Sequence, residues 1–154
     1  MYYRYLLFIA IAVILCSCVP LSVRGGFSPI QGPLANQSPL PTYPATMSGV
    51  LSGTISVVLS NGEVCNGPWA FVSRTPPAGT ATETIDLAAQ WDAVYGSGFY
   101  ISHVLGNKLY ARATLTGKGT TVHVELTNEN DKPGNTRGVA QDNRGNIFKV
   151  SVYN

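Results

Sequence analysis

LYARATLTGKGTTVHVEL, residues 109–126, is the stretch that decides the fold class. Apolar and polar residues alternate along both of its arms, which is the period of a β-strand with one buried face. The glycines at 117 and 119 lie between the arms, where the chain must turn. The stretch therefore predicts an antiparallel hairpin. Tyr110 and Glu125 fall on its polar face. We expect Glu125 at an exposed strand position; core packing is favoured for each aromatic residue of the domain, and Tyr110 is the one whose position best suits contact with solvent.

Two further hairpins are predicted on either side of this one. Residues 53–72 form two apolar runs around Asn61-Gly62, a pair that tolerates the positive φ angles of a tight hairpin turn. Residues 136–153 form a second pair of strands across a turn at 142–145. Three hairpins indicate a mainly β fold, either a small antiparallel barrel or a curved sheet of about six or seven strands with one packed α-helix.

The one predicted helix covers residues 83–95. Leu87, Trp91, Val94 and Tyr95 have the spacing of a single helical face, and Gly96 is placed to end the helix. The segment 96–106 has no clear period. It is typical of a short strand or helical turn against the core, with an active-site loop as the alternative.

Composition limits the class of partner and the chemistry. The chain has 154 residues and a net charge of only +2. Its basic residues are scattered singly and form no basic face, so we expect no binding to nucleic acid. Of three cysteines, Cys16 and Cys18 lie near the N-terminus, which leaves Cys65 for the folded part. We therefore expect a buried, unpaired Cys65 and no disulfide. The spacing of Cys and His predicts no metal site and no cofactor.

The N-terminal residues have the pattern of an export signal. Arg4 precedes an apolar run over residues 6–14, which is followed by Leu15-Cys16-Ser17-Cys18. This segment resembles the signal of bacterial lipoproteins. The resemblance implies that residues 1–17 are removed and that the Cys18 thiol carries lipid. In lipoproteins of Gram-negative bacteria, a residue other than Asp after the acylated cysteine favours sorting to the outer membrane. Because Val19 follows Cys18, the resemblance also implies that the protein lies on the outer membrane and faces the periplasm in such a host. The alternatives for this segment are an ordinary cleaved signal peptide and an uncleaved N-terminal membrane anchor.

The region after the signal is rich in proline, glycine and polar residues. Residues 18–46 contain six prolines and few large apolar side chains, so we predict a flexible tether there. A proline-rich ligand for a partner's groove is a lesser alternative. Residues 47–154 are then expected to form a single β-rich domain, the size of one small core.

Two segments of this domain carry a second resemblance. ISVVLSNGEVCNGPW (residues 55–69) and RGVAQDNRGNIFKV (residues 137–150) are similar to small uncharacterised secreted proteins and lipoproteins of bacteria. Both segments are strand, turn and returning strand. The resemblance implies the anchor and the β-rich domain, and it brings no known activity.

Catalytic chemistry has few candidates. The sequence has only two histidines, His103 and His123, and no Gly-x-Ser-x-Gly nucleophile motif. His123 falls on the polar side of a predicted strand. A small envelope hydrolase or transferase that pairs His103 with a carboxylate of the helix is therefore the alternative function.

Binding chemistry is carried by aromatic residues. Trp69, Tyr100, His103 and Tyr110 are the candidate binding residues, although the same residue types also fill the cores of small β domains. The function favoured by the sequence is a non-catalytic envelope lipoprotein. It would be attached to the membrane by its N-terminal lipid and would bind another envelope protein, peptidoglycan or lipid.

Overall fold

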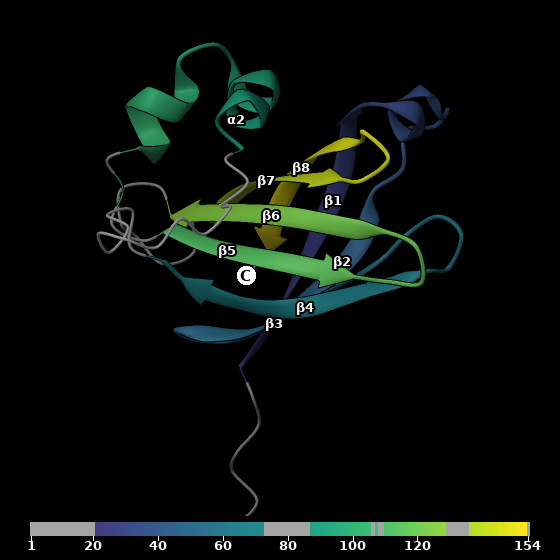
Figure 1. Cartoon of the computed structure of the whole chain (residues 1–154), viewed down its shortest axis with the longest axis horizontal. Helices are drawn as coiled ribbons and strands as arrows, with labels where there is room; N and C mark the ends of the chain where they lie inside the picture. The colour runs from purple at the N-terminus through teal and green to yellow at the C-terminus, as the bar shows by residue number, and fades with distance from the viewer. Residues whose placement is uncertain (1–20, 73–86, 106, 108–109, 129–135, 154) are drawn as a thin grey trace, which may run out of the picture.

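The protein is described by a computed structural model that covers residues 21–72, 87–105, 107, 110–128 and 136–153 (Figure 1). The described strands form a closed antiparallel barrel in the order β1 to β8, with β8 paired to β1. The prediction of a mainly β fold with a small barrel and one packed helix is confirmed. The elements are β1 (Ser22–Gln31), η1 (Pro33–Asn36), β2 (Tyr43–Gly49), β3 (Ser52–Val58), β4 (Val64–Phe71), α2 (Ala88–Tyr95), η2 (Tyr100–Val104), β5 (Tyr110–Thr116), β6 (Thr121–Asn128), β7 (Thr136–Asp142) and β8 (Ile147–Tyr153).

The three predicted hairpins are present as β3–β4, β5–β6 and β7–β8. Gly62 has a φ of 74°, as the Asn-Gly turn between β3 and β4 requires. The barrel has eight strands among the described residues, so the predicted number of six or seven was too low. The two strands that the sequence did not reveal are β1 and β2.

The prediction of a flexible tether over residues 18–46 is wrong from Ser22 onward. β1 closes the barrel between β2 and β8, and β2 begins at Tyr43. The two prolines within β1 and β2 are tolerated because they lie where a ladder is irregular or ends: Pro29 precedes a register shift against β8, and Pro44 precedes the first residue of β2 that pairs with β3. The folded domain therefore begins about 25 residues earlier than the predicted boundary at 47.

The core fills the inside of the barrel. Side chains alternate between the two faces of each strand, and the inward ones include the fully buried Val57, Cys65, Leu115 and Phe148. The rings of Phe27 and Phe148 meet edge to face at 6.1 Å, which joins β1 to β8. Cys65 is buried and unpaired, as predicted.

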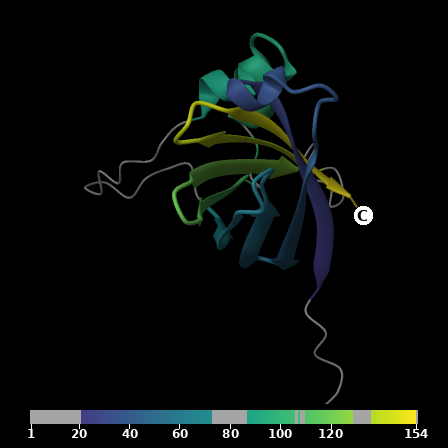
Figure 2. The same ribbon diagram turned by 90° about the vertical axis from the view of Figure 1, so that its right-hand side faces the viewer.

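The helix α2 lies outside the barrel. It packs on the outer face of β7 and β8, where Leu87, Trp91 and Val139 form a second apolar cluster with Val104 and Tyr110. The predicted helix over 83–95 is confirmed for Ala88–Tyr95, and residues 83–86 lie outside the described part of the chain. In the two perpendicular views, α2 and η1 lie on the side of the barrel away from the start of β1 (Figures 1 and 2).

Candidate functional site

The mouth of the barrel holds an apolar pocket, which we call the mouth pocket. It lies at the end where β1 begins and β4 and β8 finish, and its volume is about 200 Å³. Apolar side chains from strands on all sides form most of its wall, and the mouths of small β-barrels are a common place for ligands. The residues that line it are Leu21, Val23, Met47, Gly49, Val50, Trp69, Phe71, Ala111, Leu126, Thr127, Asn128, Thr136 and Val152.

The floor of the mouth pocket is formed by Met47, Leu126 and Val152. These three residues also line a small void of about 20 Å³ below it, which is bounded by Phe27 and Ile55 among others. The void is large enough for about one water molecule and is almost wholly apolar. Methionine is unbranched and fills irregular gaps, and Met47 lines both the pocket and the void.

Trp69 is the one sequence-predicted binding residue that lines the mouth pocket. It is 3% exposed, its ring meets Phe71 edge to face at 5.6 Å, and its indole N–H donates to the carbonyl oxygen of Ser48 at 2.8 Å. The bond ties β4 to the end of β2 across the rim. The indole is therefore fixed in position, with its polar atom satisfied and its apolar face left for the pocket.

Polar groups lie along one side of the mouth. The Thr136 hydroxyl donates to the side-chain oxygen of Asn128 at 2.6 Å, and the amide of Asn107 donates to the hydroxyl of Thr127 at 2.7 Å. Thr127 and Asn128 end β6, Thr136 begins β7, and Asn107 precedes β5. A few polar groups at the edge of an apolar pocket are what fixes the orientation of a ligand.

Tyr110 is buried, as core packing of the aromatic residues predicted, and it does not line the mouth pocket. It is 2% exposed on the outer face of β5, and its hydroxyl accepts a hydrogen bond from Nε of Arg112 at 2.9 Å. Burial, together with the nearby carboxylate of Glu125, raises the pKa of Tyr110 above its usual range. Its hydroxyl therefore stays neutral, and the residue belongs to the packing beneath the helix.

Glu125 is also buried, at 1% exposure, where the sequence predicted an exposed strand position. Its Oε2 accepts the indole N–H of Trp91 at 2.9 Å, and its Oε1 lies 3.1 Å from the guanidinium of Arg112. The backbone N–H of Leu87 also donates to Oε1, at 3.4 Å. The carboxylate thus holds the start of α2 against the barrel wall, and it does not line the mouth pocket.

The residues of the alternative, catalytic interpretation lie apart from the mouth pocket. His103 is exposed on η2 and its ring packs on Phe99 at 4.6 Å, while Tyr100 is half-buried. The helix carboxylate Asp92 accepts the backbone N–H groups of Tyr100 (2.9 Å) and Gly98 (3.1 Å). The bond from Tyr100, and to a smaller extent that from Gly98, lowers the pKa of Asp92. The other predicted helix carboxylates, at 83 and 86, lie outside the described residues.

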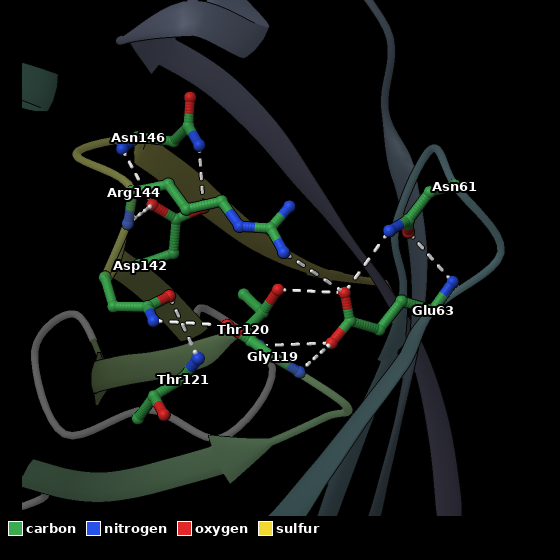
Figure 3. A network of polar contacts seen from close by, with 9 residues as sticks. Asn61, Glu63, Gly119, Thr120, Thr121, Asp142, Arg144 and Asn146 are labelled. Carbon is green, nitrogen blue, oxygen red and sulfur yellow. Dashed lines mark hydrogen bonds and ion pairs between the residues drawn. The ribbon is translucent and has the colours of Figure 1, made fainter.

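At the far end of the barrel, the carboxylate of Glu63 joins the start of β4 to the β5–β6 turn (Figure 3). Its Oε1 accepts the backbone N–H groups of Gly119 and Thr120, at 3.0 and 3.1 Å, and its Oε2 accepts the Thr120 hydroxyl at 2.9 Å and pairs with Arg144 at 3.6 Å. The pKa of Glu63 is lowered from 4.5 to about 2, and the hydrogen bond from the Thr120 hydroxyl is the largest cause. Since the folded-state pKa is lowered, this contribution to stability is complete above pH 4.5 and is lost as the pH falls through 2.

The described residues offer neither a metal site nor a membrane-spanning helix. They contain no group of three or more His, Cys, Asp or Glu that could hold a metal ion. In the same part of the chain, no helix has the length and apolar character needed to cross a membrane.

Comparison with known proteins gives no relative. No family model, no curated protein and no solved structure matches this chain.

Proposed function

We propose that the protein is a non-catalytic lipoprotein of the cell envelope whose barrel binds the apolar end of a lipid in the mouth pocket. The observation that carries this proposal is the pocket itself, an apolar hollow of about 200 Å³ walled by Val23, Met47, Trp69, Phe71 and Leu126. Of the three partner classes that the sequence left open, envelope protein, peptidoglycan and lipid, an apolar hollow favours lipid.

The size of the mouth pocket limits what enters it. Pockets that enclose drug-sized ligands have volumes of roughly 300–1,000 Å³. At about 200 Å³ the mouth pocket is smaller, so it suits the end of one acyl chain and not a whole lipid. Thr127, Asn128 and Thr136 at the edge would contact a more polar part of the same molecule.

The location in the envelope depends on Cys18. The segment Leu15-Cys16-Ser17-Cys18 supports cleavage before Cys18 and acylation of its thiol. Several acyl chains hold a protein on a bilayer firmly where a single chain does so only marginally. With Val19 next in the chain, the outer membrane facing the periplasm is the expected location in a Gram-negative host.

Filling the floor of the mouth pocket should abolish ligand binding. The probe is palmitate carrying a nitroxide near its methyl end, which quenches tryptophan fluorescence at short range. We expect saturable quenching in the wild type through Trp69, and an affinity lowered at least tenfold in the double variant Met47→Phe/Val152→Phe. The matched control is Ser56→Phe/Asn66→Phe, since these paired residues of β3 and β4 face outward and line neither the mouth pocket nor the void below it.

The control should bind the probe within about twofold of wild type. Circular dichroism would show that both double variants keep the barrel. Equal affinities for the floor variant and the control would contradict binding in the mouth pocket, as would a wild type whose fluorescence the probe leaves unchanged.

Replacing Cys18 should remove the membrane anchor. In bacteria fed an alkyne analogue of palmitate, we expect the wild type to incorporate the label and to partition into detergent. Cys18→Ser should lose all labelling and accumulate as a precursor that keeps residues 1–17, because the serine hydroxyl cannot form the thioether. Cys65→Ser is the control, and its labelling should equal that of wild type. Labelling that persists in Cys18→Ser would show that the anchor is elsewhere.

A further inference from the structure

The rim of the barrel mouth carries exposed apolar side chains on the β1 side. Leu21, Val50 and Leu51 are 62%, 67% and 74% exposed. They form one group, because the backbone N–H of Gly49 donates to the carbonyl oxygen of Leu21 at 3.0 Å. This bond joins the start of β1 to the end of β2, which Val50 and Leu51 follow directly. We call these three residues the rim patch. Two of its members, Leu21 and Val50, also line the mouth pocket.

The position of the rim patch along the chain relates it to the proposed anchor. Leu21 follows Cys18 by three residues. A fully extended chain spans at most about 3.6 Å per residue, so Leu21 lies no more than about 11 Å from Cys18. β3 alone, with seven residues, spans roughly 23 Å. The segment from Cys18 to Leu21 is thus shorter than a single barrel strand. An acylated Cys18 would therefore keep the mouth end of the barrel near the lipid.

The chemistry of this end suits a bilayer surface. Leucine and valine side chains that are largely exposed in water can enter the boundary between headgroups and acyl chains. Arg24 is exposed on the outer face of β1, two residues beyond Ser22, where a cation can meet an anionic headgroup. The helix α2 and η1 lie on the side away from the start of β1, so they do not obstruct this approach (Figure 2).

We propose that the rim patch docks on the lipid bilayer in which Cys18 is anchored, so that the mouth pocket opens toward the membrane. This inference rests on the proposed function for the anchor at Cys18. A protein partner is less well supported, because the patch lies within a few residues of the lipid attachment point. In this orientation an acyl chain can enter the mouth pocket directly from the bilayer.

The test uses the mature, lipidated protein in vesicles of phosphatidylethanolamine and phosphatidylglycerol. A nitrobenzoxadiazole dye is attached to cysteine in Leu51→Cys, on the rim patch. The matched control is Asn61→Cys, in the turn at the other end of β3. Cys65 is fully buried, and burial raises the pKa of its thiol, so dye-treated wild type serves as the blank.

We expect a lipid that carries a nitroxide near its headgroup to quench the dye at residue 51 at least threefold more than the dye at residue 61. Equal quenching at the two positions would overturn the docking. Palmitate labelling is measured on the same samples. If residue 51 is quenched without palmitate labelling, docking is supported and the anchor at Cys18 falls; if labelling occurs and neither position is quenched, the anchor holds and the docking falls.

Discussion

Replacing Glu125 by alanine is expected to lower the free energy of unfolding by about 3 kcal/mol. The substitution leaves the guanidinium of Arg112 without its carboxylate and the buried indole N–H of Trp91 without its acceptor. Breaking a buried ion pair by removing one partner costs about 3–5 kcal/mol. We take the lower end because the side chain of Arg112 is 27% exposed, while that of Glu125 is 2% exposed.

Urea unfolding followed by tryptophan fluorescence measures this loss. Glu125→Gln is the matched control, because it keeps an acceptor for Trp91 and removes only the charge, so its loss should be clearly smaller. A double-mutant cycle with Arg112→Ala isolates the coupling between the two residues. If Glu125→Ala unfolds within 1 kcal/mol of wild type, the carboxylate does not hold α2 against the barrel.

The sequence predicted the strands whose side chains alternate without interruption. Residues 110–116 and 121–126 show that pattern on either side of a turn, and they lie in β5 and β6. β1 was hidden because Gly25, Gly26 and Pro29 interrupt its pattern, and these residues have low strand propensity. The signal for β2 was present, since the inward Tyr43, Ala45 and Met47 alternate with outward residues. Its position beside a proline-rich segment led to the tether prediction.

The candidate site depended on contacts that no local pattern contains. The mouth pocket exists because β1 pairs with β8, which brings Val23 close to Val152 from opposite ends of the chain. Trp69 could be named from its residue type, while the other lining residues are ordinary strand residues. Glu125 was predicted to be exposed because it lies on a polar strand face. Its burial follows only from α2 packing over that face, which joins residues 34 positions apart.

Replacing Gly67 by alanine is expected to prevent the barrel from closing. A Cβ at Gly67 would lie 2.0 Å from the carbonyl oxygen of Thr114, so β4 and β5 would have to separate. The β4–β5 ladder resumes beyond this point at Trp69 and Ala113, and separation would disturb both the ladder and the mouth pocket. Overpacking usually costs about 1–3 kcal/mol, and a clash with backbone should exceed that range.

Gly119→Ala provides the matched control, because the only atom near its added Cβ is the tip of Arg144 at 3.8 Å. Its backbone N–H can still donate to Glu63. We expect Gly119→Ala to unfold within about 0.5 kcal/mol of wild type, whereas Gly67→Ala should lose most of its folded population or its far-ultraviolet β signal. Equal stability of the two variants would mean that β4 can shift at Gly67. The close approach to β5 would then be dispensable for keeping Trp69 in the pocket wall.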